Sequence, residues 1–132
     1  MKRILTFAAM LCIAVPLTAQ SRIETITLHS KLLNADKTCT VYLPDGYDSG
    51  TTRRYPILYL LHGASDTHTA WTGKGNMRQI TDEAIAAGMA CPMVIVMPDA
   101  SGEGERHTGR HMCYFDVPDW PYGRFFFEEF MP

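Results

Sequence analysis

A histidine, a glycine and an aspartate stand close together in the middle of the sequence. His62 and Gly63 end a continuous apolar run, and Asp66 and Trp71 follow in a predicted loop. A histidine can serve as a general base when the proton that it takes lies within hydrogen-bond reach. At the buried end of a strand it more often makes structural hydrogen bonds. We therefore expect His62 to hold the loop rather than to catalyse.

A second group of chemistry-bearing residues lies later in the chain, where His107, His111 and Cys113 form an H-x₃-H-x-C pattern. Imidazole and thiolate groups are ligands for transition metals. No fourth ligand stands at a recognisable spacing, and the surrounding glycines predict a loop. We expect solvated or hydrogen-bonded histidines here, and neither a metal nor another cofactor.

Composition and charge place the chain among ordinary globular proteins. It has 132 residues, 46% of them hydrophobic and 20% charged, which suits one small domain. Twelve Lys and Arg stand against fourteen Asp and Glu, giving a net charge of −2. Because this balance gives no broad basic surface for a phosphate backbone, nucleic acid is not an expected partner.

The first nineteen residues predict a secretory signal peptide. Lys2 and Arg3 precede an apolar run over residues 4–17, which is too short to span a membrane and is followed by small residues. Cleavage after Ala19 leaves residues 20–132, exported to the periplasm or beyond, with no membrane anchor. The cysteines that remain are odd in number, so one disulfide beside a free thiol and no disulfide at all are both open: Cys39, Cys91 and Cys113.

Two alternating segments predict an antiparallel hairpin. Residues 25–33 place Ile26 and Leu28 on one face, and residues 38–43 alternate in the same way after an Asn-Ala-Asp turn. This period of two is typical of β-strands.

The middle of the chain predicts a parallel pair of strands joined by a helix. Residues 55–63 and 93–97 are unbroken apolar runs, typical of strands buried on both faces. Between them, residues 77–88 have helical periodicity, with Met77, Ile80, Ala84 and Ala87 on one face. Asn76 and Gln79 resemble a capping pair, and Gly88 is a natural stop. The order predicts a right-handed βαβ crossover.

The end of the sequence is rich in aromatic residues. Pro121 suits the first turn of a helix, whose predicted inner face consists of Phe126, Phe127, Phe130 and Met131. We expect most of these rings to dock the helix on the sheet. Only Trp120 and Tyr122 are expected to reach a substrate pocket.

Five pieces of sequence occur in a specific order. They are Tyr42–Tyr47, Tyr55–Gly63, the pair Asp66 and Trp71, Val94–Asp99, and Phe125–Pro132. Together they cover nearly all of residues 20–132 and resemble the esterase D type of α/β-hydrolase, which includes S-formylglutathione hydrolases, feruloyl and acetylxylan esterases, and mycolyltransferases. The resemblance implies the N-terminal portion of an α/β-hydrolase fold, in which a hairpin leads into a parallel sheet with crossover helices.

The same resemblance implies acyl transfer through a serine, with a histidine base and an acid that orients it. The nucleophile of this family lies in a G-x-S-x-G turn. No serine of the sequence has glycine two positions away on both sides: Ser21, Ser30, Ser49, Ser65 and Ser101. In the family the nucleophile, acid and catalytic histidine follow the aromatic helix. We therefore expect a domain truncated before the nucleophile elbow and without a triad.

The resemblance also assigns roles around the loop. The backbone N–H of Ala64 would be one of two donors to the tetrahedral oxyanion, and Gly63 would give the loop its geometry. The alternative for Gly63 is a tight turn alone. Asp66 and Trp71 would border the acyl or alcohol pocket, with packing against the helix as the alternative for Trp71.

The expected function is that of a secreted serine carboxylesterase acting on acyl esters of carbohydrate or of a small alcohol. The 132-residue chain alone is expected to be inactive. One alternative is a non-catalytic binding module, and a weaker one is a metal-dependent hydrolase using His107, His111 and Cys113. The sequence leaves open which ester is used, whether the acyl group passes to water or to another alcohol, and the oligomeric state.

Overall fold

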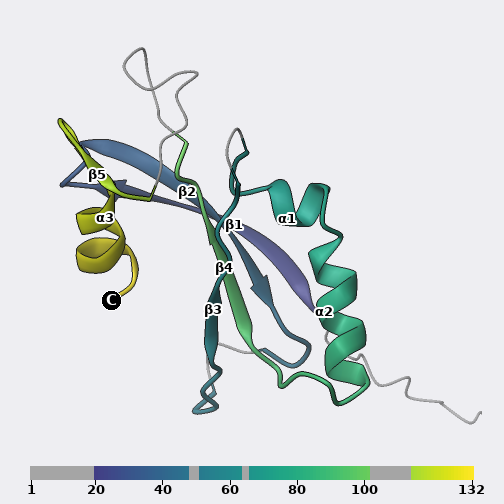
Figure 1. Ribbon diagram of the computed structural model, residues 1–132. Coiled ribbons are helices and arrows are strands. Elements are labelled where there is room, and N and C mark those ends of the chain that lie inside the picture. Colours follow the sequence, from purple (N-terminus) through teal and green to yellow (C-terminus); the bar gives the residue numbers. More distant parts are fainter. Residues whose placement is uncertain (1–19, 48–50, 64–65, 102–113) are drawn as a thin grey trace, which may run out of the picture.

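A four-stranded sheet is the centre of the computed structural model, which describes residues 20–47, 51–63, 66–101 and 114–132 (Figure 1). The strands lie in the order β1 (Arg22–Ser30), β2 (Ala35–Leu43), β4 (Val94–Pro98) and β3 (Ile57–Tyr59). β2 pairs antiparallel with both β1 and β4, and β3 pairs parallel with β4. The predicted hairpin and the predicted parallel pair are both confirmed.

The first strand is displaced from its predicted position. It runs from Arg22 to Ser30 rather than over residues 25–33, because residues 31–34 form the turn of the hairpin and Asn34 adopts a φ of 49°. Asparagine is one of the few side chains that tolerate this left-handed conformation. The predicted Asn-Ala-Asp turn is wrong in part, since Ala35 and Asp36 belong to β2.

The connection from β3 to β4 contains α1 (Ala70–Gly73) and α2 (Met77–Ala86). The side chains of Asn76 and Gln79 bond to each other at 2.8 Å, but Asn76 makes no capping bond to the helix backbone. The stop at Gly88 is confirmed. Its φ is 70°, its N–H donates to the carbonyl of Ile85 at 3.0 Å, and the next N–H reaches Ala84 at 2.9 Å, as in a Schellman motif.

The predicted inner face of α2 is wrong at Ile80, which is 59% exposed, and at Ala87, which is also exposed, whereas Met77 is buried. The reason is a pair of hydrogen bonds to Asp82 on the same helix. The Asp82 carboxylate accepts hydrogen bonds from the Tyr42 hydroxyl at 2.7 Å and from the Ser21 hydroxyl at 2.6 Å. These bonds turn the Asp82 side of the helix toward β2 and leave Ile80 outside.

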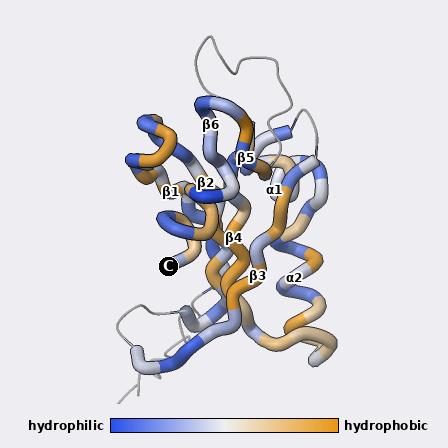
Figure 2. The backbone as a smooth tube through the Cα atoms, turned by 60° about the vertical axis from the view of Figure 1, so that its left-hand side comes forward, coloured by the Kyte–Doolittle hydropathy of each residue, from blue (hydrophilic) through white to orange (hydrophobic). Residues whose placement is uncertain are grey.

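The apolar run at residues 55–63 is not buried on both faces as predicted. Only Ile57–Tyr59 form β3, although Leu60 continues the pairing through an N–H bond to Val96 at 2.9 Å. Ile57 is 56% exposed and Leu58 is also exposed. In the described part of the chain β3 is one of the two edge strands of the sheet, and the hydrophobic stretches of β3 and β4 lie side by side (Figure 2).

The aromatic end of the chain packs against the turn of the β1–β2 hairpin (Figure 1). It contains β5 (Asp116–Val117), β6 (Trp120–Pro121), α3 (Tyr122–Phe125) and a π-helical segment, η1 (Phe126–Phe130). Trp120, Tyr122 and Phe125 are buried in one cluster with Leu33 and Ala100.

The predicted inner face of this last helix is wrong in part. Phe125 is buried, whereas Phe127 is 69% exposed and Met131 is exposed. In η1 the Met131 N–H bonds to the carbonyl of Phe126, five residues earlier, so the spacing of an α-helix does not hold there. Glu129 of this segment accepts the Ser30 hydroxyl at 2.6 Å and thereby ties η1 to the end of β1.

No helix among the described residues is long and apolar enough to cross a membrane. The predicted signal peptide, residues 1–19, lies outside the described residues.

Candidate active site

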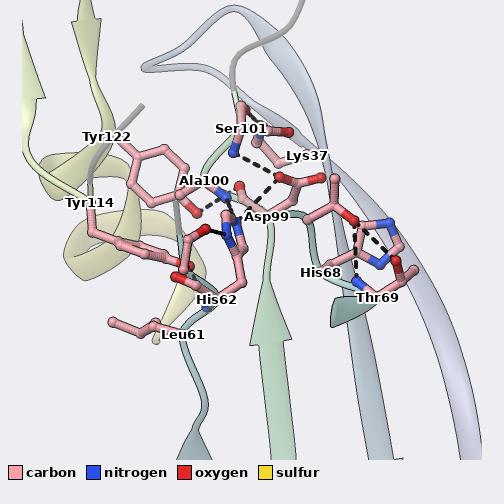
Figure 3. A network of polar contacts seen from close by, with 12 residues as sticks. Lys37, Leu61, His62, His68, Thr69, Asp99, Ala100, Ser101, Tyr114 and Tyr122 are labelled. Carbon is pink, nitrogen blue, oxygen red and sulfur yellow. Dashed lines mark hydrogen bonds and ion pairs between the residues drawn. The ribbon is translucent and has the colours of Figure 1, made fainter. Parts of the chain in front are cut away.

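The candidate site lies where the two parallel strands end. His62 and Gly63 follow β3, and Asp99 and Ala100 follow β4 (Figure 3). Because β3 and β4 run in the same direction, both segments leave the sheet at the same edge. The carboxyl edge of a parallel sheet is where α/β proteins place their ligands.

The imidazole of His62 joins the two strand ends. Its Nε2 accepts the N–H of Ala100 at 2.9 Å, and its Nδ1 lies 2.8 Å from the carbonyl oxygen of Gly63. A carbonyl can only accept, so Nδ1 carries the proton and the ring is neutral in this arrangement. Both nitrogens are therefore used inside the protein, which agrees with the structural role expected for His62.

Asp99 sets the electrostatics of this junction. Its Oδ1 accepts the Ser101 N–H at 2.7 Å and lies 3.6 Å from Nε2 of His62. Burial alone would raise the pKa of Asp99, but the neighbouring His62 ring, the Ser101 N–H bond and the charge of Lys37 outweigh burial and lower the pKa to about 2. Asp99 is therefore ionised at neutral pH.

The same carboxylate acts on the histidine. Burial lowers the pKa of His62, but the Asp99 carboxylate and the Gly63 carbonyl outweigh burial, so that the pKa is raised. A proton on Nε2 would have to displace the Ala100 N–H from that nitrogen. The Ala100 amide and a proton thus compete for one lone pair.

Two tyrosines from the end of the chain complete the junction. The Tyr114 hydroxyl lies 2.8 Å from the backbone nitrogen of His62, and the Tyr122 hydroxyl donates to the carbonyl of Asp99 at 2.8 Å. The two rings meet edge to face at 5.7 Å. Sequence reasoning did not single out Tyr114 for this site.

Lys37 is a further residue that sequence reasoning missed. It is 1% exposed, and its ammonium group donates to the carbonyl of Ser101 at 2.8 Å and lies 5.6 Å from the centre of the Trp120 ring. A signal was present, because Lys37 has the same strand parity as Cys39 and Val41. A lysine in phase with core residues must find polar partners inside the protein.

Three contacts hold residues 66–74 in place. The indole N–H of Trp71 donates to the carbonyl of Leu61 at 2.9 Å, and His68 Nδ1 is hydrogen-bonded to the Thr40 hydroxyl at 2.7 Å. The Lys74 ammonium group contacts the Asp66 carboxylate. Ala64, the predicted oxyanion donor, and Ser65 lie outside the described residues.

The structure gives these predicted site residues local contacts without testing their roles. Trp71 is partly exposed beside the loop, and its ring would be 3.2 Å from a Cβ added at Gly75, so it also packs locally. A Cβ added at Gly63 meets no described atom within 4 Å. The roles of Gly63, Asp66 and Trp71 stay predictions.

Trp120 and Tyr122 lie in the core rather than on an open surface. The Tyr122 hydroxyl is engaged by the carbonyl of Asp99. Contact with substrate stays a prediction for both residues, and their packing gives it no support.

Two large cavities of the described residues lie elsewhere. One, of about 580 Å³, lies over the sheet face around Val41, Val96 and Phe130, and the other, of about 490 Å³, lies beside Tyr42 and Arg78. Neither is lined by His62, Gly63, Asp66 or Trp71. These two cavities are therefore not the predicted substrate pocket.

The remaining chemistry of the chain gives no metal site among the described residues, where no group of three or more potential ligands occurs. The predicted cluster of His107, His111 and Cys113 lies outside them. Cys39 is buried and Cys91 exposed, and both are free thiols. Burial raises the pKa of Cys39.

Comparison with known proteins identifies the class to which this fold and site belong. A family model described as "Putative esterase" matches residues 30–121, which is more than half of the chain. The chain belongs to this esterase family, as its resemblance to esterase D-type α/β-hydrolases predicted.

Individual relatives agree. A ferulic acid esterase structure is 40% identical, with a TM-score of 0.79 over 89% of this chain and 42% of its own. A mutant of the feruloyl esterase module from Clostridium thermocellum, complexed with sinapinate, is 31% identical, with a TM-score of 0.57 over 65% of this chain and 29% of its own.

A curated relative extends the comparison to larger proteins. The endo-1,4-beta-xylanase/feruloyl esterase of Xylanibacter ruminicola is 38% identical over 78 residues, which is 57% of this chain and 11% of that protein. This chain therefore spans less than half of the ferulic acid esterase and about a tenth of the Xylanibacter protein. The predicted fold class is confirmed, and the described residues form a portion of an α/β-hydrolase fold.

Proposed function

We propose that this chain supplies the oxyanion-loop portion of an exported serine carboxylesterase of the feruloyl esterase kind. The observation that carries the proposal is the junction at His62, where the imidazole joins the Gly63 carbonyl to the Ala100 N–H. This junction fixes the loop entrance to the end of β4, in a chain of the esterase family. A fixed loop is what an oxyanion donor requires, since its N–H must already point at the place where charge develops.

In the proposed reaction the loop acts in the step that forms the oxyanion. A serine Oγ attacks the ester carbonyl carbon, its proton passes to a histidine, and the carbonyl oxygen becomes an oxyanion. The backbone N–H of Ala64 is one donor to that oxyanion. Collapse of the intermediate expels the alcohol, which takes the proton from the histidine, and leaves an acyl-enzyme. Water then attacks the acyl-enzyme with the same histidine as base.

The triad is proposed to come from a part of the domain outside this chain. His62 is not the base in this proposal, because one of its nitrogens donates to Gly63 and the other accepts from Ala100. Asp99 is not the acid that orients the base, because its carboxylate is bound to the Ser101 N–H and faces His62.

The proposed substrate is a small aromatic acyl ester, such as a feruloyl group on carbohydrate. Support comes from relatives named as ferulic acid esterase and endo-1,4-beta-xylanase/feruloyl esterase. Lys2, Arg3 and the apolar run that follows support export by a signal peptide. This acyl-enzyme chemistry needs no metal or organic cofactor, and the proposal includes neither nucleic acid nor membrane as partner.

The test compares two proteins, the 132-residue chain and the longest polypeptide that its gene encodes. Each is purified and assayed for release of ferulate from methyl ferulate and of p-nitrophenol from its acetate. We expect turnover, and labelling of one serine by a fluorophosphonate, only in the longer polypeptide. A folded longer polypeptide that hydrolyses no ester would refute the esterase. If it binds ferulate without hydrolysis, the non-catalytic module is the better description.

A further inference from the structure

Tyr114 contacts the backbone of His62, which lies 52 positions earlier in the chain. Its hydroxyl accepts the backbone N–H of His62 at 2.8 Å and lies 3.4 Å from the carbonyl oxygen of the same residue. One side-chain hydroxyl thus faces both backbone polar groups of His62, the residue directly before Gly63 (Figure 3).

The contact lies directly after the last hydrogen bond between this segment and β4. The Leu60 N–H still bonds to Val96 of β4 at 2.9 Å. Two residues later, the His62 N–H points to Tyr114 instead. A partly buried amide without a partner is unfavourable, and the Tyr114 hydroxyl supplies the His62 N–H with an acceptor beyond the last bond of the sheet.

The ring of Tyr114 is held in place independently of that hydroxyl. It lies 5.5 Å from the His62 ring and meets Tyr122 edge to face at 5.7 Å. Burial is the main reason that the pKa of Tyr114 rises to about 12, so the hydroxyl keeps its proton at neutral pH. The phenol is therefore a fixed, uncharged partner for the His62 peptide.

We propose that Tyr114 is a positioning residue of the esterase reaction, whose hydroxyl fixes the backbone of His62, the residue directly before Gly63, at the entrance of the oxyanion loop. The proposal rests on the proposed function. His62 is then held twice, by its imidazole on Ala100 and by its backbone on Tyr114. The first contact joins the loop to β4, and the second determines the direction in which the chain leaves β3.

The test is Tyr114→Phe in the longest polypeptide that the gene encodes. Phenylalanine keeps the ring contacts and removes both contacts to the His62 backbone. We expect kcat for methyl ferulate to fall by about ten- to a hundredfold, the loss typical of a small misplacement in an active site. KM should stay within about twofold, because the substrate pocket itself is unchanged.

Tyr42→Phe is the matched control. Tyr42 is fully buried and loses a 2.7 Å bond to Asp82, but it pairs with Ile95 near the start of β4, away from the strand end that carries the site. Tyr42→Phe should lower Tm and leave kcat unchanged. Tyr114→Phe should lower kcat with a smaller change in Tm.

Each outcome decides between the two proposals. If the wild type is active and Tyr114→Phe has normal kcat, or loses kcat only in proportion to unfolded protein, Tyr114 is not a positioning residue. If the wild type hydrolyses no ester, the proposed function fails first and the positioning role falls with it. Amide hydrogen exchange of His62 remains a separate check, because it should be faster in Tyr114→Phe, and an unchanged rate would show that the contact does not hold the peptide.

Discussion

Replacing His62 by glutamine separates two roles that a histidine can have at the end of β3. As a general base, His62 would be needed for turnover and not for folding. As the junction seen in the structure, it is needed for folding, because its Nε2 is the acceptor for the Ala100 N–H and its Nδ1–H donates to Gly63.

The magnitude follows from these two bonds. Ala100 is fully buried, and a buried amide that loses its acceptor costs about 1–3 kcal/mol. An amide side chain has an oxygen and an NH₂ group, so glutamine can retain one of the bonds, whereas alanine loses both. We expect His62→Gln to lower the free energy of unfolding by about 1–2 kcal/mol, and His62→Ala by about 2–4 kcal/mol.

The assay measures urea unfolding and kcat side by side in the longest polypeptide that the gene encodes. We expect the folded His62→Gln enzyme to keep kcat within about tenfold of the wild type, because the substitution removes one hydrogen bond that holds the loop and does not remove a general base. The reasoning is refuted if His62→Gln unfolds at the wild-type urea concentration but has no activity. His62 would then be a catalytic residue.

Three further predictions concern the same polypeptide and the chain itself. The pKa of Asp99 in the folded protein is about 2, below its ordinary value of 3.8, so the carboxylate stabilises the fold above pH 4 and loses this effect as the pH falls to 2. The difference in unfolding free energy between wild type and Asp99→Asn should therefore be up to about 2 kcal/mol at neutral pH, and it should shrink as the pH falls from 4 to 2. A difference that does not depend on pH would contradict this prediction. Ala64→Val should crowd the acyl carbonyl and lower kcat by about one to three orders of magnitude at unchanged Tm; normal turnover would remove Ala64 from the oxyanion site. The 132-residue chain alone should self-associate on a sizing column, because Ile57 and Leu58 are exposed on β3, an edge strand of the described sheet; a monomer with one cooperative melting transition would show this expectation to be wrong.

Local sequence patterns were sufficient for the elements whose structure depends on near neighbours. Alternation over residues 38–43 predicted β2, and the glycine at position 88 predicted the end of α2, where its φ of 70° suits a residue without a Cβ. The apolar run at residues 93–97 predicted β4, which pairs on both sides. In each case a short segment contains the information.

Burial was predicted less well, because it depends on what lies beside an element. The runs at residues 55–63 and 93–97 look alike in sequence, but β4 lies between two strands and β3 lies at an edge of the described sheet. Ile80 has the correct helical spacing and is still exposed, since the bonds of Asp82 to Tyr42 and Ser21 decide how α2 is turned. Such bonds join residues 40 and 61 positions apart.

The candidate site also combines a motif that the sequence showed with contacts that it did not show. The His-Gly sequence at the end of an apolar run was visible as a motif, but its partners were not, because Ala100 and Tyr114 lie 38 and 52 positions further along the chain. No periodicity connects a tyrosine to a peptide group at that separation. Only the meeting of β3, β4 and the aromatic end of the chain brings them together.

Lys37 shows that part of this long-range information was nevertheless present in the sequence. Lys37 lies on the same face of the strand as the core residues Cys39 and Val41. A buried ammonium group there needs acceptors or aromatic rings around it. Its partners are the Ser101 carbonyl and the rings of Trp120 and Tyr122. Its charge is also one of the influences that lower the pKa of Asp99. The buried charge of Lys37 on β2 thus helps to keep the Asp99 carboxylate beside His62 ionised.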